Sequence, residues 1–112
     1  MKGETPELTP HEVQVLLDRG DIQILDVRTP AEFKGGHIDG AVSVPIGKLE
    51  DAADELPLDP TMPVVAVCLT AHRSIGAVRL LKRKGYDVVQ LQGGMRAWRK
   101  ADLPEKTGKP TN

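Results

Sequence analysis

The sequence is poor in features that mark several large classes of protein. Aromatic residues make up 3% of its 112 residues, and 15 Lys and Arg nearly balance 16 Asp and Glu. Nucleic-acid binding draws on a basic surface and on aromatic stacking platforms, so we expect no nucleic-acid partner. The longest apolar run is Val64 to Leu69, far short of the ~18 residues that suggest a membrane span. We therefore expect no membrane partner.

Cysteine is nearly absent as well. Cys68 is the single cysteine, which excludes an intrachain disulfide framework and a multi-cysteine zinc site. The three histidines show no metal-ligand spacing, so we predict no metal. The first ten residues lack the apolar stretch of a secretion signal, and we expect a cytoplasmic location.

What is present fits one globular domain. Hydrophobic residues make up 39% of the chain and there are 11 glycines, enough to build a core in a chain of this length. We place the domain at residues 5–103 and a polar C-terminal tail at residues 104–112, and we expect the polar segment from Ala101 to Asn112 to be loose. The apolar periodicity predicts strands at Ile22–Val27, Val42–Val44, Val64–Val67 and Val88–Leu91, and helices at about 10–19, 30–35, Leu49–Leu56, 73–84 and Met95–Lys100.

Two helix starts carry the same signal. Thr9 is followed by proline and then by Glu12, and Thr29 is followed by proline and then by Glu32. A threonine at the N-cap and a glutamate three residues later form a capping box. Strands that alternate with helices predict a three-layer α/β domain, with a central parallel β-sheet flanked by helices on both faces.

The most β-branched segment, Val64–Val67, ends at Cys68. Ligands of parallel sheets bind beyond the carboxyl ends of the strands, and the loop from Cys68 to Ser74 leads from such an end into a helix. Backbone amides of this loop and the positive end of the helix can surround an anion, and Arg73 can close that cradle with a guanidinium. A lone cysteine at the end of a buried strand is often only a small hydrophobe. Because of the loop that follows, we favour a nucleophilic Cys68 thiolate.

Three segments together resemble the single-domain rhodaneses, a family of sulfurtransferases. They are DVRTPAEFKGGHIDGAVSVP from Asp26, the loop CLTAHRS from Cys68, and GYDVVQLQGGMRAW from Gly85. The resemblance covers the chain from Thr9 to about Leu103. It implies a five-stranded parallel sheet whose short first strand lies near Glu7 to Thr9.

The resemblance also implies a chemistry. Cys68 would take the outer sulfur of thiosulfate or another sulfane donor, such as a persulfide, become a persulfide itself, and pass the sulfur to cyanide or a thiol. The backbone of the binding loop would stabilise the charge on that sulfur. No cofactor is implied, and the partners would be a small sulfur donor and a thiol acceptor, or a sulfur-carrier protein. The binding loop consists of Leu69, Thr70, Ala71, His72, Arg73 and Ser74.

This chain departs from the family pattern at two loop positions. Many members have a basic residue directly after the cysteine and a glycine in the middle of the loop, where this chain has Leu69 and Ala71. Leu69 removes a cation from the mouth of the loop, which weakens binding of free thiosulfate and favours a persulfide delivered by a protein or a small thiol. Alanine is costlier than glycine if the loop requires a positive φ.

Other polar residues have simpler interpretations. Asp26, Arg28 and Glu32 follow a strand end, where we predict a structural ion pair behind the site, with Glu32 also completing the Thr29 cap. We interpret His37 as a structural or surface residue. His72 lies inside the loop, where it can touch substrate or tune the thiolate.

Two other functions compete with sulfur transfer. A cysteine phosphatase or arsenate reductase uses a similar strand, loop and helix, but usually has five residues between cysteine and arginine, and here there are four. The tighter loop suits one sulfur atom better than a phosphoryl group. A non-catalytic binding module of the same fold is the second alternative, although such modules typically lack the cysteine.

Overall fold

The computed structural model describes residues 6–70 and 72–110, with side chains at all of these except His72 and Arg73. Five strands alternate with five helices within the described residues. The strands are β1 (Glu7–Leu8), β2 (Gln23–Asp26), β3 (Val42–Ser43), β4 (Val64–Val67) and β5 (Val88–Leu91). The helices are α1 (Pro10–Asp18), α2 (Pro30–Gly35), α3 (Ile46–Ala52), α4 (His72–Arg83) and α5 (Gly94–Lys100).

The strands form one parallel sheet in the order β1-β5-β4-β2-β3. The β4 strand lies in the middle and all four of its residues are buried, as its β-branched, uncharged sequence predicts. The three-layer α/β class is confirmed. The short first strand, implied only by the family resemblance, is present at the sheet edge as β1.

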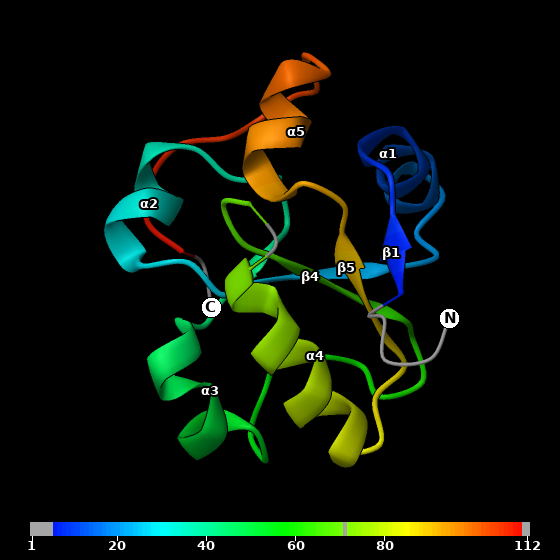
Figure 1. Cartoon of the computed structure of the whole chain (residues 1–112), viewed down its shortest axis with the longest axis vertical. Helices are drawn as coiled ribbons and strands as arrows, with labels where there is room; N and C mark the ends of the chain where they lie inside the picture. Colours follow the sequence, from blue (N-terminus) through cyan, green and yellow to red (C-terminus); the bar gives the residue numbers. More distant parts are fainter. Residues whose placement is uncertain (1–5, 71, 111–112) are drawn as a thin grey trace.

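Two apolar clusters cover the two faces of the sheet, and Figure 1 shows α3 and α4 on one side and α1 and α5 on the other. Alternate residues of β4 belong to different clusters: Val64 and Ala66 face α3 and α4, whereas Val65 and Val67 face α1, α2 and α5. This alternation follows from the two-residue repeat of a strand. Cys68 continues the first set and joins the cluster on the α3 and α4 side.

Both predicted capping boxes are confirmed. The Thr9 hydroxyl accepts from the backbone N–H of Glu12 while the Glu12 carboxylate accepts from the backbone N–H of Thr9. Thr29 and Glu32 make the same reciprocal pair at α2. Each cap satisfies backbone donors that a helix start would otherwise leave unpaired.

The helix predicted at Leu49–Leu56 is observed at Ile46–Ala52, so it starts three residues and ends four residues earlier than predicted. Pro45 occupies the N-cap, and the N–H of Ile46 donates to the carbonyl of Val27 at 3.0 Å. This bond ties the helix start to the chain leaving β2. The prediction was wrong because the start of the helix is determined by this backbone hydrogen bond, which leaves no signal in the sequence. In the sequence, Pro45 indicated the end of a strand and not the start of a helix.

The C-terminal segment is also different from the prediction of a loose tail. Lys106 and His37 exchange two backbone hydrogen bonds, of 2.8 and 2.7 Å, and the N–H of Gly108 donates to the carbonyl of Lys34. The indole N–H of Trp98 donates to the carbonyl of Pro104 at 2.9 Å. The segment therefore packs along α2, where Figure 1 shows it in red.

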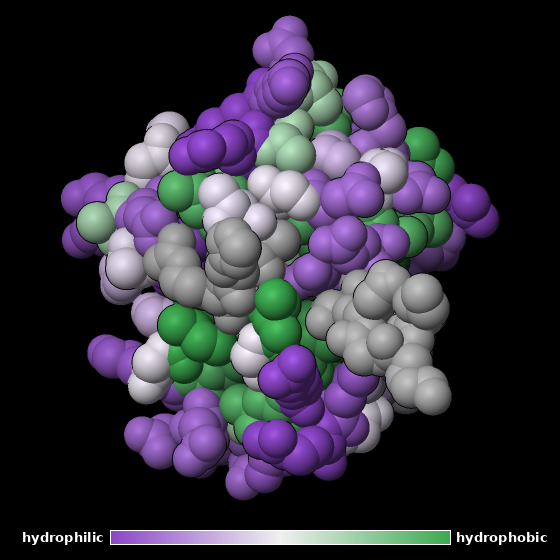
Figure 2. Space-filling model, in the orientation of Figure 1, coloured by the Kyte–Doolittle hydropathy of each residue, from purple (hydrophilic) through white to green (hydrophobic). Residues whose placement is uncertain are grey.

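The surface in Figure 2 is mostly polar, with apolar residues gathered over the region of α3 and α4. Ile46, Leu80 and Tyr86 are partly buried and pack against the apolar cluster on the α3 and α4 side of the sheet. Among the described residues, none of the helices has the length and apolar character needed to cross a membrane.

Candidate functional site around Cys68

Cys68 is placed by the central strand. It directly follows β4, and the backbone of Val27 continues the pairing of β2 with β4 by donating to the carbonyl of Val67 at 2.9 Å. The cysteine is a free thiol and is 1% exposed. The structure therefore puts Cys68 at the carboxyl end of the sheet, the edge where parallel sheets bind ligands, with its side chain buried in the apolar cluster on the α3 and α4 side.

The backbone after Cys68 is held by the start of α5. The N–H of Met95 donates to the carbonyl of Cys68 at 2.8 Å, and the N–H of Arg96 donates to the carbonyl of Leu69 at 3.0 Å. Gly94 lies in the left-handed region, with φ +61°, and a Cβ on it would overlap the carbonyl of Cys68 and the backbone of Leu69. A glycine is therefore required for this close approach.

Gly94 is a site residue that sequence reasoning missed. The Gly93-Gly94 pair indicated a turn, but nothing in the sequence linked that turn to a cysteine about 25 residues earlier. Two consecutive glycines before a helix were the only available signal.

The predicted binding loop is placed in parts. Leu69 and Thr70 are half-buried, and His72 and Arg73 begin α4. Ala71 and the side chains of His72 and Arg73 lie outside the described residues, so the amide cradle and the roles of these residues stay predictions.

Ser74 is fully buried, and its hydroxyl donates to the Gln90 side chain at 2.8 Å. Gln90 in turn donates to the Glu7 carboxylate at 2.8 Å. The start of α4 is thus tied through β5 to the edge strand β1. This chain of hydrogen bonds, buried at Ser74 and Gln90 and exposed at Glu7, positions the loop end. A contact of Ser74 with substrate stays a prediction.

Asp26 and Arg28 meet beside the cysteine strand. Arg28 Nη2 lies 2.7 Å from Asp26 Oδ2, Arg28 Nε lies 3.0 Å from Asp26 Oδ1, and both side chains are 1% exposed. Arg28 Nη2 also donates to the carbonyl of Gly36 at 2.8 Å. A buried pair with this many hydrogen bonds ties the end of β2 to the turn after α2.

His37 lies behind this turn. Its Nδ1 is 2.8 Å from the carbonyl of Phe33, and its ring stacks on the Phe33 ring with centroids 3.7 Å apart. The residue is 8% exposed, which fits a packing role. Among the described residues, no group of three or more His, Cys, Asp or Glu side chains is arranged to hold a metal.

A hollow of about 540 Å³ lies next to the cysteine loop and is called here the Leu69 pocket. Leu69 forms one wall, α2 contributes a second, and Arg99 of α5 with Glu105 of the C-terminal segment forms a third. Its principal lining residues are Arg28, Ala31, Glu32, Leu69, Arg99 and Glu105. The positions of Arg99 and Glu105 beside the cysteine loop were not predicted from the sequence.

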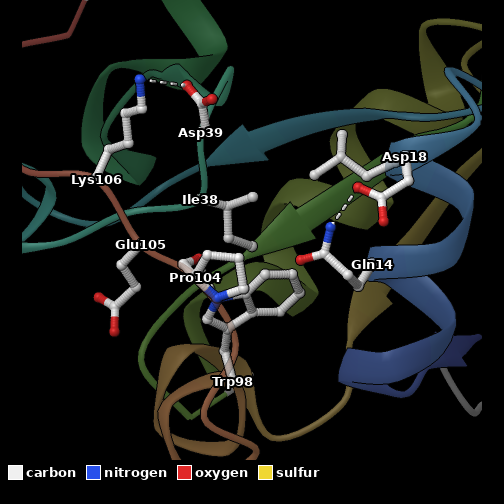
Figure 3. A pocket seen from close by; sticks show the side chains of 9 residues that line it. Gln14, Asp18, Ile38, Asp39, Trp98, Pro104, Glu105 and Lys106 are labelled. Carbon is white, nitrogen blue, oxygen red and sulfur yellow. Dashed lines mark hydrogen bonds and ion pairs between the residues drawn. The ribbon is translucent and has the colours of Figure 1, made fainter.

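A second hollow of about 440 Å³ lies between α1 and the C-terminal segment. Figure 3 shows Trp98, Ile38 and Pro104 on one side, with the Gln14 and Asp18 side chains bonded to each other on the other side. None of the described residues between Cys68 and Ser74 lines it. It is therefore separate from the cysteine loop.

The comparisons with known proteins agree with this geometry. The family profile of the rhodanese-like domain matches residues 9–101. The chain belongs to the rhodanese-like family. A protein named sulfurtransferase from Allochromatium vinosum is 37% identical over 92 residues, which cover 81% of this chain and 84% of that protein.

Two further matches are to much longer proteins. An HTH-type transcriptional regulator of Mycobacterium tuberculosis is 38% identical over 95 residues, 83% of this chain and 41% of the regulator. A crystal structure of a thiosulfate sulfurtransferase from Pseudomonas aeruginosa has a TM-score of 0.83 at 34% identity, covering 95% of this chain and 21% of that one. The chain spans about half or less of the first curated relatives it matches, 41% and 54%. Rhodanese-like domains of this kind therefore occur inside larger proteins.

Proposed function

We propose that this rhodanese-like domain is a sulfurtransferase that carries a sulfane sulfur on Cys68. The observation that supports this most is the position of the cysteine. Cys68 directly follows the central strand of a rhodanese-like domain, and α4 begins four residues later at His72. The positive end of a helix and nearby backbone amides favour a thiolate over a thiol at such a position.

The reaction has two displacement steps. In the first, the Cys68 thiolate attacks the outer sulfur of thiosulfate or of a thiol persulfide. The donor's S–S bond breaks, sulfite or a thiolate leaves with the bonding electrons, and Cys68 becomes a persulfide. In the second, cyanide or a thiolate attacks the outer sulfur of the persulfide and restores the Cys68 thiolate. Neither step requires an external oxidant or reductant.

The residues near Cys68 have separate roles in this proposal. Backbone amides between Leu69 and Arg73 stabilise the charge on the outer sulfur, because donors fixed in place need no reorganisation as charge develops. Asp26, Arg28 and Glu32 act only as structural support. The partners are a small sulfur donor and a thiol acceptor, with a sulfur-carrier protein as an acceptor of the same chemistry.

Intact mass spectrometry tests the first step. After incubation with thiosulfate or a thiol persulfide, the protein should gain the mass of one sulfur atom, and peptide mapping should place it on Cys68. The Cys68→Ala variant should gain nothing. If no donor adds sulfur to the folded wild-type protein, the proposed function is wrong.

A non-catalytic binding module is the second candidate. The observation that favours it is the burial of Cys68 among apolar residues at 1% exposure, where a cysteine can serve as a small hydrophobe. Under native conditions a catalytic Cys68 should react with a small alkylating reagent much faster than global unfolding allows. Alkylation that occurs only at the rate of unfolding would favour the binding module.

A further inference from the structure

The cysteine loop is held at both ends by β5 and the segment that follows it. At the beginning of the loop, two backbone N–H groups at the start of α5 donate to the carbonyls of Cys68 and Leu69. At its end, the hydroxyl of Ser74 donates to the side chain of Gln90, a β5 residue, at 2.8 Å. Of these contacts, the bond at the end is the one made by side chains, so single substitutions can remove it without changing the backbone.

Gln90 lies on the same face of the sheet as the cysteine side chain. It follows Val88 by two residues, and Val88 belongs to the apolar cluster on the α3 and α4 side, so the two-residue repeat of a strand puts both side chains on that face. Gln90 pairs with Ala66 in the strand register. Cys68 follows Ala66 by two residues and belongs to the same cluster. Gln90 therefore brings a polar amide to the apolar face where Cys68 is buried.

The orientation of the Gln90 amide is determined by Glu7 on the edge strand. An ionised carboxylate can only accept hydrogen bonds, so the amide must present its Nε2 to Glu7, to which it donates at 2.8 Å. The Oε1 of Gln90 then faces Ser74 and accepts its hydroxyl proton. A hydroxyl has a single proton to donate. The oxygen of Ser74 can therefore act only as an acceptor toward other groups at the start of α4.

We propose that Gln90 is a positioning residue for sulfur loading of Cys68, and that Glu7 orients it. This inference rests on the sulfurtransferase function proposed above. Gln90 acts through Ser74, the third residue of α4: it holds the first turn of this helix, and with it the loop that joins the turn to Cys68. A carboxylate at the sheet edge is thus linked to the cysteine loop by two consecutive hydrogen bonds.

Burial makes this chain sensitive to substitution. Ser74 is 0% exposed and Gln90 is 5% exposed, so removal of the amide takes the acceptor of the Ser74 proton from a place that water does not reach. A buried donor that loses its acceptor is costly, and the first turn of α4 must shift to reduce that cost. A displacement of ~1 Å can lower the rate of a reaction by up to about a hundredfold. A partial shift should therefore slow sulfur loading measurably.

The same substitution at two glutamines tests the role of Gln90. Gln90→Met keeps the approximate size of the side chain and should lower the rate of loading about tenfold. The matched control is Gln23→Met at the first residue of β2, the opposite end of the sheet from Cys68. The Gln23 amide also makes buried or partly buried bonds, to the backbone of Asp59 and Met62. Its loss should lower stability and leave the loading rate at the wild-type value.

The rate of loading is followed by intact mass, under conditions where circular dichroism shows each variant to be folded. The donor is thiosulfate, or hydroxyethyl persulfide if thiosulfate does not load the wild-type protein. Urea denaturation gives the free energy of unfolding of each variant. The ratio of the loading rates at similar losses of stability separates positioning from general structural support, because support alone would affect both glutamine variants alike.

Substitutions of Glu7 test the orientation of the chain from an exposed position. Glu7→Gln can still accept from the Nε2 of Gln90 through its own amide oxygen, and should retain most of the wild-type rate. Glu7→Lys can only donate, so it either turns the Gln90 amide, which then presents Nε2 to Ser74, or breaks the bond. Loading should fall about threefold, as for the loss of one hydrogen bond. The added positive charge by itself would attract an anionic donor and raise the rate.

The outcomes distinguish this inference from the function beneath it. Equal loading rates in Gln90→Met and Gln23→Met overturn the inference while sulfur transfer stands. A lack of sulfur on Cys68 of the wild-type protein with both donors overturns both. Should Gln90→Met fail to fold, the Glu7 variants decide: a loading rate in Glu7→Lys that equals or exceeds the rate in Glu7→Gln contradicts the role of the chain.

Discussion

The carboxyl ends of β2 and β4 are neighbours in the sheet but have opposite chemical character. Asp26 pairs with Val67 in the strand register, so the two ends lie side by side. At the end of β2, Asp26 and Arg28 form a buried ion pair with several hydrogen bonds. At the end of β4, no hydrogen bond to the Cys68 sulfur is present among the described residues.

This difference indicates that the two strand ends have different roles, one structural and one chemical. A buried charge persists only with a matched partner, and the removal of one partner is costly. A cysteine side chain is small and apolar enough to be buried without such a partner. We infer that the β2 end fixes the geometry and that the β4 end carries the chemistry.

The largest expected effect on stability comes from removing the ion pair at the end of β2. Arg28→Met leaves Asp26 buried without its cation and should lower the free energy of unfolding by ~3–5 kcal/mol, as measured by urea denaturation. The matched control is Arg19→Met. Arg19 pairs with Asp21 on the surface, with side chains 66% and 47% exposed, and its loss should cost less than ~1 kcal/mol. Equal costs for the two variants would contradict a supporting role for the buried pair.

The next effect comes from the backbone behind Cys68. Gly94→Ala combines a positive φ with a clash against the backbone of Cys68 and Leu69, and should cost ~3 kcal/mol and slow sulfur loading. Gly20 has a similar φ of +74° in open space, so Gly20→Ala should cost only ~1 kcal/mol. If urea denaturation gives the same cost for both, the close approach of α5 to the cysteine loop is not tight.

A smaller effect is expected at the N-cap of α1, which is on neither strand end. Thr9→Ala should lower the free energy of unfolding by about 1 kcal/mol and leave loading of Cys68 unchanged. If Thr9→Ala slows sulfur loading as much as Gly94→Ala does, the loading rate does not depend specifically on the backbone beside Cys68.

The same cap gives a pH dependence. Hydrogen bonds from the backbone and then from the side chain of Thr9 hold the pKa of Glu12 below its usual value of 4.5. Because the folded-state pKa is the lower one, this contribution to stability is present above the usual value and is lost as pH falls through the folded value. Acid titration of stability should therefore be shallower in Thr9→Ala than in the wild type. Identical acid profiles would contradict the cap's role.

The smallest expected effect is on donor choice at the β4 end. Leu69→Arg places a cation directly after Cys68 and should raise the rate of loading by thiosulfate about threefold. Leu69→Met, which keeps the apolar character and approximate volume, should leave that rate unchanged. A thiosulfate rate that does not respond to the added charge would show that residue 69 does not face the donor.

The sequence was sufficient to predict those features of the fold that depend on a local pattern of residues. The β-branched run at Val64–Val67 predicted the central strand, and the two Thr-Pro-x-Glu segments predicted capped helices at the right residues. The buried pair of Asp26 and Arg28 was also accessible, because the two residues flank a strand end in the chain.

The remaining features depend on contacts between distant segments. The C-terminal segment is held at His37 by backbone hydrogen bonds, which leave no side-chain signal at Lys106. Arg99 reaches the carbonyl of Gly36, 63 residues away in the chain, so its place beside the cysteine loop follows only from the folded structure. For the same reason the role of Gly94 could not be derived from its turn motif.

The most direct test of the central claim is a single-turnover discharge of Cys68. Protein loaded with a sulfane donor is separated from that donor and mixed with cyanide, and the mass of the protein and the thiocyanate formed are measured together. Our account predicts that the added sulfur disappears from Cys68 while an equal amount of thiocyanate appears. Protein that never takes up the sulfur, or that keeps it in the presence of cyanide, would contradict the account.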